Sequence, residues 1–466
     1  MAASSYRFAA VLGIAVLGGS VRGTVSLPAV LGDHAVLQRD AEIPVWGWAG
    51  PGEPVAVSFA GQTRSTRADA AGRWRVTLAP LAASAQPRDL LVQGINTVRS
   101  RDVLVGEVWL CSGQSNMEKP LGERAGQKPV FNFEAELAAA HFPEIRLMKV
   151  PKLKADSPAP DAQTGWVPCE PASLDQTKFS AAGYFFGRKL FQELQVPIGL
   201  IDSTFGGTLI EPWTPGSPAG NLYNGMIHPL VPFRLRGVLW YQGETNLMDL
   251  NDGANYSGKM ERLIDGWRAA WRQPDLPFYY AELAPFAYHL FMPERVASPE
   301  LLPRFWEAQA ACRRIPHTGM IVTTDLVDDL FDIHPRNKQE VGRRFALLAL
   351  ARTYGRNDVV CEGPEYRRLE LRGDRAILHF DGVDGGLMSR DGKALTWFTV
   401  AAAGGEFQPA AAEIDGDTVV VHSPRVARPA IVRFAWDEGA RPNLCNRAGL
   451  PALPFRTDSP PPALDR

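Results

Sequence analysis

The feature that most constrains this chain is an alternation, beginning at Val103, between short apolar runs and longer segments with helical periodicity. Strands are expected at 103–111, 198–202, 236–241, 278–283 and 320–324, and helices at 179–194, 256–271, 305–313 and 335–354. Strands that alternate with helices are typical of a parallel sheet, because parallel neighbours need a crossover connection. Residues 104–355 are therefore predicted to form an α/β domain, with Pro335 in the first turn of its last helix.

Both flanks of this region carry short alternating segments broken by turn residues, which indicate β structure. These segments fall at 43–48, 55–59, 74–78 and 89–92 before the α/β region, and at 366–371, 376–380, 418–422 and 430–434 after it. We predict a small β-sandwich over 24–103 and a second β domain over 356–466. Residues 150–175 are rich in Pro and polar side chains and are expected to be a surface excursion within the α/β domain.

The first 23 residues have the pattern of a secretory signal peptide. Arg7 precedes an apolar run over 8–19, and small residues follow at Ser20 and Gly23. A start-site extension or an apolar N-terminal strand is the alternative. The run is too short to predict a transmembrane span. We expect an exported protein, periplasmic or secreted, that has no membrane association once the signal is removed.

Charge and cysteine content exclude several classes of partner. The 49 Lys and Arg against 51 Asp and Glu leave a net charge of −2, which gives no basic surplus for binding nucleic acid. The five cysteines form no C-x-x-C pair, so no metal site is predicted. Free buried thiols are favoured, although one oxidised pair stays open, and the oligomeric state is not predicted.

Two segments contain the residue types of a serine hydrolase. Ser115 lies on a Gly-containing turn directly after the strand predicted at 103–111, where parallel sheets expose nucleophiles. Asp332 and His334 lie two residues apart before a helix and supply a carboxylate and a base. A helix-starting turn and a helix-capping histidine are the structural alternatives. The rival residues are His228 for the base and Asp325, Asp328 and Asp329 for the carboxylate.

Further turns follow other predicted strands. Gly207 and Gln242 could supply a backbone N–H and an amide to a developing oxyanion, although either turn alone would be weak evidence. Glu244 is expected to support the site or cap its turn. Asn116 is expected to fix the nucleophile turn through side-chain to backbone hydrogen bonds. His228 either lines the pocket or is buried against backbone.

At these segments the chain resembles the sialate O-acetylesterase family of the SGNH hydrolase superfamily. The matching stretches include VGEVWLCSGQSNME, VPIGLIDSTFGGTLIEPW, RGVLWYQGETN, DIHPRNKQEVGRRFA and, near the end, NLCNRAGLPALPFRTD. The resemblance implies an SGNH-type α/β/α sandwich and a serine esterase that uses no metal or organic cofactor. It implies Ser115 as nucleophile, His334 as general base and Asp332 as the group that orients it. The oxyanion hole would comprise the backbone N–H of Ser115, Gly207 and Gln242.

Two details differ from the wider superfamily, in which the carboxylate precedes the histidine by three residues and the third motif carries Asn. Here the spacing is two and the residue is Gln242, as in the acetylesterase branch. The resemblance implies an acetylated carbohydrate substrate. That substrate is a sialic acid acetylated at its 9-hydroxyl, or alternatively an acetylated polysaccharide such as xylan. A non-catalytic carbohydrate-binding protein is the remote alternative. A sialic carboxylate would favour an arginine near the pocket, but sequence does not show whether Arg124, Arg234 or Arg336 lies there.

Overall fold

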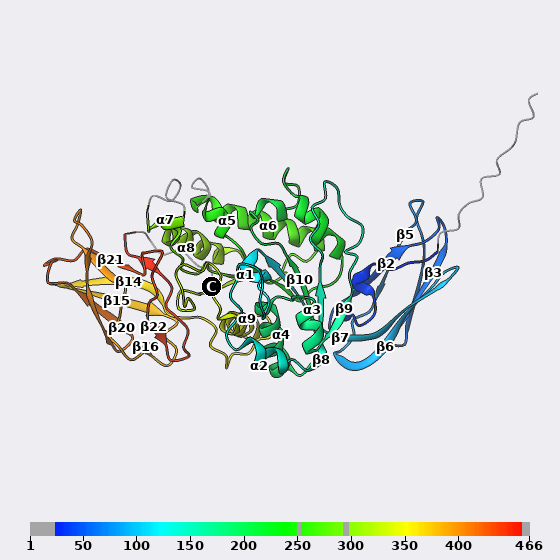
Figure 1. Cartoon of the computed structure of the whole chain (residues 1–466), viewed down its shortest axis with the longest axis horizontal. Coiled ribbons are helices and arrows are strands. Elements are labelled where there is room, and N and C mark those ends of the chain that lie inside the picture. Colours follow the sequence, from blue (N-terminus) through cyan, green and yellow to red (C-terminus); the bar gives the residue numbers. More distant parts are fainter. Residues whose placement is uncertain (1–23, 249–252, 292–297, 459–466) are drawn as a thin grey trace, which may run out of the picture.

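The structure is a computed structural model that describes residues 24–248, 253–291 and 298–458. The predicted signal peptide at 1–23 lies outside the described residues. Figure 1 shows an N-terminal β part, a central part of helices and strands, and a C-terminal β part in succession along the long axis. The chain is therefore a mixed α/β protein with one large sheet and additional β sheets, as the alternating pattern indicates.

The sheet of the central part has the strand order β13-β12-β11-β7-β10-β8-β9. Its strands are β7 (Thr97–Gly113), β8 (Phe142–Lys149), β9 (Trp166–Cys169), β10 (Ile198–Thr204), β11 (Gly237–Tyr241), β12 (Phe278–Ala281) and β13 (Thr318–Ile321). All neighbours pair parallel except β8 and β9. The five strands predicted for this region are confirmed. Sequence analysis missed β8, and it was wrong to treat 150–175 as one surface excursion, because β9 returns to the sheet and α3 (Pro171–Gln176) follows it.

Helices cover both faces of this sheet. Trp109 of β7 packs edge-on against Phe186 of α4 (Ala181–Leu194), with ring centroids 5.0 Å apart. Trp240 of β11 faces the other way and packs against Trp267 of α6 (Tyr256–Trp271) at 5.9 Å. Helix α9 (Lys338–Arg352) lies beside α4, and α8 (Leu301–Ala311) lies beside α6. In Figure 1, α4 and α9 accordingly lie below the sheet and α6 and α8 above it.

Helix α9 begins later than its sequence pattern predicts. Asn337 caps it, since the Asn337 Oδ1 accepts a hydrogen bond from the Glu340 backbone N–H at 3.1 Å. Pro335 therefore lies before the helix and not in its first turn, so that part of the prediction was wrong. An asparagine cap satisfies a helix N–H that would otherwise have no partner, which is why the helix starts there.

Short helices occupy several loops of the central part. They are α1 (Ser115–Glu118), α2 (Phe133–Ala138), α5 (Glu244–Leu247), α7 (Tyr288–Phe291), the turns Glu211–Trp213, His228–Leu230, Gly253–Asn255 and Cys312–Arg314, and the π-helical Tyr223–Ile227, while one further turn, Ala29–Leu31, lies in the N-terminal part. Two of them, α1 and α5, directly follow strands of the parallel sheet. They are the elements that carry the candidate site.

The N-terminal part is joined to the central sheet through β7. The first half of this 17-residue strand pairs with β1 (Val36–Gln38) and β6 (Ser84–Gln93), and its second half with β10 and β11. The remaining strands are β2 (Ile43–Trp48), β3 (Pro54–Phe59), β4 (Gln62–Arg67) and β5 (Arg73–Leu78). The predicted boundary at residue 103 thus falls inside β7. One continuous hydrophobic core runs through both parts, from Val25 to Leu350.

The C-terminal part has a separate hydrophobic core and only antiparallel strands. One sheet contains β14 (Glu365–Arg372), β15 (Arg375–Asp381), β19 (Ala411–Asp415) and β20 (Thr418–His422). A second contains β17 (Phe398–Ala401), β18 (Gln408–Pro409), β21 (Ile431–Phe434) and β23 (Phe455–Arg456), while β16 (Leu387–Ser389) pairs with β22 (Leu444–Asn446). The four strands predicted here are confirmed.

All five cysteines are free, as expected, and all but Cys361 are buried. Across the described ranges, no helix has the length and apolar character needed to cross a membrane.

Candidate active site

The three central strands end together at one edge of the sheet. Gly113 of β7 is level with Thr204 of β10 and with Tyr241 of β11. Because the strands are parallel, the loops that follow them leave from the same edge. Ser115, Gly207 and Gln242 are therefore brought to one place, as the sequence predicts for an α/β site.

Ser115 lies directly against the turn that follows β10. A Cβ atom built on Gly206 would lie 3.2 Å from the Cβ of Ser115 and 2.9 Å from the Glu118 Oε2, so this position has room only for glycine. The next residue, Gly207, has a φ of 73°, which also favours glycine, and it is exposed. The Gly-Gly pair thus lets the β10 turn approach the serine closely.

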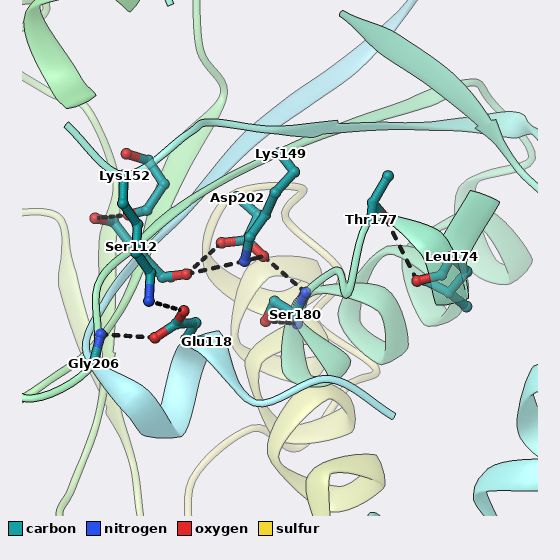
Figure 2. Close-up of polar contacts among 12 residues, drawn as sticks. Ser112, Glu118, Lys149, Lys152, Leu174, Thr177, Ser180, Asp202 and Gly206 are labelled. Atoms are coloured by element: carbon teal, nitrogen blue, oxygen red, sulfur yellow. Dashed lines mark hydrogen bonds and ion pairs between the residues drawn. The ribbon is translucent and has the colours of Figure 1, made fainter. Parts of the chain in front are cut away.

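Glu118, at the end of α1, holds this turn in place. Its Oε2 accepts a hydrogen bond from the Gly206 N–H at 2.7 Å and pairs with Arg124 at 3.0 Å, and its Oε1 pairs with Lys152 at 2.5 Å. Figure 2 shows the carboxylate pointing toward the Gly206 backbone. Burial opposes ionisation of Glu118, but the hydrogen bonds from Lys152 and Arg124 outweigh it and lower the pKa of this carboxyl group. Sequence analysis missed Glu118; its signal was the three-residue spacing from Ser115.

A second buried carboxylate, Asp202 near the end of β10, holds the start of α4. It accepts hydrogen bonds from the Ser180 N–H at 2.8 Å, from Lys149 at 2.6 Å and from the Thr204 hydroxyl at 2.7 Å. Figure 2 shows Asp202 between Ser180 and Lys149. The strand end that leads to Gly206 is therefore fixed to the helix beneath it.

Asn116 joins the nucleophile turn to the loop of His334. Its Nδ2 donates to the Ile333 carbonyl at 3.0 Å and to the Glu244 Oε1 at 2.5 Å, and its Oδ1 accepts from the Lys338 Nζ at 2.7 Å. The side chain is buried and does not contact solvent. Its backbone partner is Ile333 and not a residue of its own turn, so Asn116 links three loops.

The partners of Asn116 are two buried ionisable groups. Burial raises the pKa of Glu244, and the Glu244 Oε2 has no hydrogen-bond partner in the part of the chain that the structure describes. Burial, together with the charge of Lys119, lowers the pKa of Lys338 to about 7. The Lys338 ammonium also lies 5.1 Å from the centroid of the Tyr241 ring. Lys338 was missed because nothing local distinguishes it from a solvated helix lysine.

His334 and Asp332 are adjacent but not ideally aligned. The His334 Nδ1 lies 3.7 Å from the Asp332 Oδ1, which is longer than a hydrogen bond, and that oxygen accepts the His334 backbone N–H at 2.9 Å. Burial, then the charges of Lys338 and Lys119, lowers the pKa of His334 to about 3. The imidazole is therefore neutral at neutral pH and able to accept a proton.

Two of the rival carboxylates have other partners. Asp325 forms a two-pronged ion pair with Arg344, with distances of 2.6 and 2.7 Å, and Asp329 pairs with Lys128 at 2.8 Å. Asp332 therefore remains the carboxylate recorded next to the His334 ring.

The Gln242 side chain is fully buried and already hydrogen-bonded. Its Nε2 lies 2.7 Å from the Asn246 Oδ1, 3.0 Å from the Thr208 carbonyl and 3.1 Å from the Gln114 Oε1. Its Oε1 accepts from the Tyr256 hydroxyl at 2.8 Å. The amide thus ties together the loops after β7, β10 and β11. Gln114, which sequence analysis missed, is the polar residue immediately before Ser115.

Two other candidates are held elsewhere. The His228 Nδ1 lies 3.2 Å from the Ala159 carbonyl, and no recorded contact joins His228 to Ser115 among the residues described. Trp213, an aromatic residue shortly after the Gly-Gly turn, is completely buried, donates its ring N–H to the Thr208 hydroxyl at 3.0 Å and packs on Trp240, so it is not available to stack on a sugar. It is therefore a packing residue.

An open groove runs beside Asp332. It is lined by Glu123, Arg124, Ala125, Gly126, Gln127, Lys128, Pro129, Asp329, Phe331 and Asp332. Of the three arginines considered for a sialic carboxylate, Arg124 lines this groove. Arg336 instead donates to the Pro129 carbonyl at 2.8 Å and covers the Phe131 ring at 4.6 Å.

Comparison with known proteins identifies the class as carbohydrate esterases. The structure superposes on the crystal structure of a carbohydrate acetylesterase from Xanthomonas citri with a TM-score of 0.85 and 40% sequence identity, covering 94% of this chain and 100% of that one. A family model described as carbohydrate esterase, sialic acid-specific acetylesterase, matches residues 105–351. Human sialate O-acetylesterase is 31% identical over 407 residues, 75% of each chain, and the mouse protein 29% identical over 428 residues, covering 74% of this chain and 77% of its own.

The chain therefore belongs to the sialic acid-specific acetylesterase family of carbohydrate esterases. It is a carboxylic ester hydrolase that acts on acetylated sugars, and the resemblance found in its sequence is confirmed.

Proposed function

We propose that Ser115 is the nucleophile of this esterase and that His334 is its general base. The Ser115 Oγ attacks the acetyl carbonyl while the His334 imidazole takes its proton. His334 then returns the proton to the departing sugar hydroxyl. Water activated by the same histidine hydrolyses the acetyl-serine and releases acetate.

One observation carries this assignment. The nucleophile turn packs against the turn that follows β10 and is hydrogen-bonded to the loop that carries His334. Gly206 lies against Ser115, and Asn116 donates to the Ile333 carbonyl at 3.0 Å, one residue before His334. Burial, with the charges of Lys338 and Lys119, lowers the pKa of His334 to about 3, so the imidazole is neutral but a weaker base than an ordinary histidine, and its assignment as base rests on its position. Asp332 is proposed to orient the histidine. At present its Oδ1 accepts the His334 backbone N–H, so a closer contact with the ring requires a change in the imidazole position.

The oxyanion is proposed to be held by the backbone N–H groups of Ser115 and Gly207 and by the Gln242 amide. The exposed Gly207, next to a glycine that contacts Ser115, supports the backbone donors. Gln242 contributes only if its Nε2 exchanges one of its three present acceptors for the oxyanion. Glu244 and Asn116 are proposed to hold the nucleophile turn and the loop of His334 in place without touching the substrate. His228 is proposed to line the pocket away from the reacting atoms.

The proposed substrate is an O-acetylated sialic acid, with release of the acetyl group from its 9-hydroxyl. The human and mouse relatives carry the name sialate O-acetylesterase, and Arg124 lines the groove beside Asp332, where a sialic carboxylate would share it with Glu118, its present partner. An acetylated polysaccharide such as xylan is the second candidate. The carbohydrate acetylesterase from Xanthomonas citri, 40% identical to this chain, is compatible with either sugar, because its name specifies no particular carbohydrate.

We further propose that residues 1–23 direct export to the periplasm or the medium, and that the central part is an SGNH-type α/β/α sandwich. A parallel sheet covered by helices on both faces supports the second statement. Boundaries between β and α/β architecture are proposed near residues 103 and 356, with 24–103 and 356–466 as the flanking β regions; the first boundary lies inside β7 and does not separate two folding units. Sequencing the amino terminus of the mature protein tests the export signal.

The decisive experiment is acetate release by the wild type and by Ser115→Ala on 4-nitrophenyl acetate, O-acetylated sialic acid and acetylated xylooligosaccharides. The wild type is expected to hydrolyse all acetyl esters that reach the site, and Ser115→Ala none of them. The preferred sugar then decides between the two substrates.

Ser112→Ala is the matched control. This serine lies three residues earlier on β7, and its hydroxyl donates to the Ser203 carbonyl at 2.7 Å. Its removal is expected to lower stability by about 1 kcal/mol and to leave turnover within a few fold. If Ser115→Ala retained wild-type activity, the serine assignment would be wrong. If the folded wild type released no acetate from any substrate, the carbohydrate-binding alternative would replace it.

A further inference from the structure

Two phenylalanines stand exposed beside the groove. The side chains of Phe331 and Phe291 are 63% and 55% exposed, although large aromatic side chains are usually buried. Their rings meet edge-on, with centroids 6.3 Å apart and an interplanar angle of 61°, and Phe291 in turn stacks on the buried Phe286 with centroids 4.9 Å apart and an interplanar angle of 24°. The aromatic pair is therefore supported from below while its outer surface is open.

The aromatic pair is fixed relative to the candidate active site. Phe331 directly precedes Asp332 and lines the same groove. The Ala287 N–H donates to the Leu330 carbonyl at 3.0 Å, which ties the segment of Phe291 to the loop of Phe331. The Asn116 bond to Ile333 ties that same loop to the nucleophile turn. A ligand that covered Phe331 would therefore lie at a position fixed relative to the nucleophile turn.

The remainder of the groove is polar and carries both charges. Arg124, Gln127, Lys128 and Asp329 line it, and Lys128 and Asp329 are already paired with one another. Such a lining offers hydrogen-bond donors and acceptors without a strong field of either sign, which does not favour a polyanion or a charged membrane surface. A sugar ring matches this combination, because it presents an apolar face of C–H groups to an aromatic ring and hydroxyl groups at its edge.

We propose that Phe331, braced edge-on by Phe291, forms a stacking platform for a sugar ring of the glycan chain that bears the acetylated sugar. The natural substrate is then an oligosaccharide or polysaccharide and not a free monosaccharide. This inference rests on the proposed function of Ser115 and His334, and it adds a specificity-determining surface outside the reacting atoms.

The test compares substrates that carry the same acetylated sugar with and without an attached chain. These are acetylated xylohexaose against acetylated xylobiose, and O-acetylated sialyllactose against free O-acetylated sialic acid. In the wild type, kcat/KM is expected to be higher for the longer member of at least one pair. Phe331→Ala and Phe291→Ala are expected to lower that long-to-short ratio by about fivefold, the scale of one aromatic contact, mainly through KM. Phe331→Tyr retains a ring and is expected to keep the ratio.

Trp397→Ala is the matched control, since it removes another exposed aromatic side chain from the C-terminal part. It should leave the ratio unchanged. Binding affinity for unacetylated xylohexaose and sialyllactose, titrated against Ser115→Ala with and without Phe331→Ala, measures the platform in the absence of turnover.

A wild type with no preference for chain length, or a ratio that Phe331→Ala does not change, would overturn the platform. The platform would also be overturned if Phe331→Ala changed only the oligomeric state, because the surface would then be a contact with a second copy of the chain. Failure of the catalytic proposal is recognised separately, as activity retained by Ser115→Ala.

Discussion

Two lysines lie near His334 in the interior of the site. Lys338 and Lys119 are both buried, and the pKa values of their ammonium groups are lowered to about 7 and about 8, chiefly by burial. Their charges, after burial itself, are the largest influences that lower the pKa of His334. Apart from burial, the positive charges of these two lysines therefore influence the pKa of His334, the proposed general base, more than its neighbouring carboxylate does.

The pH dependence of kcat/KM should show this directly. A base with a lowered pKa stays neutral to lower pH, so the acid limb is expected below the ordinary histidine value of about 6.5. Lys338→Met removes one positive neighbour without opening the site, which raises the pKa of His334. The acid limb should therefore move to higher pH by roughly half a unit or more.

The measurement is hydrolysis of 4-nitrophenyl acetate across the acid range. Arg343→Met, on the same helix but half exposed, is the control, and an acid limb that Lys338→Met left in place would contradict this electrostatic account.

Gln242 offers a second test at the scale of one side chain. If its amide serves the oxyanion, Gln242→Ala should lower kcat by roughly 10²–10³ with little change in KM. The measurement is steady-state kinetics together with the midpoint of thermal unfolding. A loss of activity below tenfold, accompanied by a lower midpoint, would instead assign Gln242 to bracing the three loops it now connects.

Sequence reasoning predicted the residues that have a local signature and missed those that have none. Ser115 and Gly207 follow strands and His334 precedes a helix, so a shared location could be predicted for them; what the structure adds is Gly206 packed against Ser115 and Asn116 bonded to Ile333. Lys338 and Glu118 act through partners far along the chain, Asn116 and Gly206, and such pairs appear only once the fold brings them together.

At the scale of elements, an ion-pair network joins α9 to the segment after β13 and to the C-terminal part. Arg344 of α9 binds the buried Asp325 with two hydrogen bonds, and Arg390 of the C-terminal part reaches the same carboxylate at 2.9 Å. Asp325 lies between β13 and the loop of His334. The C-terminal β part therefore contributes to holding the segment that leads to the proposed base.

Substitution of Arg344 tests how much this network contributes to the free energy of unfolding. Arg344→Met leaves the buried carboxylate of Asp325 with only Arg390, and the free energy of unfolding is expected to fall by about 3–5 kcal/mol. Chemical denaturation measures the change. The neighbouring Arg343 pairs only with Glu340 on its own helix in the contacts described, so Arg343→Met should cost less than about 1 kcal/mol. Equal losses in the two variants would be evidence against the network.

Element boundaries were harder to predict than element types. The apolar pattern found α6 exactly, but it placed the start of α9 at Pro335, because the competing signal, Asn337 as a cap, is only one residue. Strand β8 was missed since its first half is partly exposed and Glu144 and Arg146 interrupt its apolar residues. The first error overlooked a local cap, whereas the second arose because pairing with β10 and β9, and not the local pattern, decides the strand.

For the whole molecule, the N-terminal part and the central part are built on one strand and one core. Val103, Leu104 and Val105 of β7 are buried, and β1 and β6 are their pairing partners. The two parts should therefore unfold together in a single transition.

Truncation tests this expectation. A chain that starts at residue 104 loses β1 and β6 and leaves the apolar start of β7 exposed, so we expect it to aggregate when expressed. A chain that lacks only residues 1–23 keeps every described element and should fold. Solubility and circular dichroism measure both. A soluble, folded protein from residue 104 onward would show that the N-terminal part is an independent domain.

The continuity of β7 also limits how relatives of this protein can vary in length. One residue inserted between Trp109 and Gly113, with Gly113 held level with Tyr241, would turn Trp109 to the opposite face of the sheet, so that it could no longer meet Phe186. If Trp109 kept its place instead, the same insertion would displace Ser115 by about 3.3 Å from the Gly206 turn. We therefore expect insertions and deletions to be confined to the hairpins of the outer sheet and to the loops, and the distance along the chain from the outer sheet to the nucleophile to stay constant.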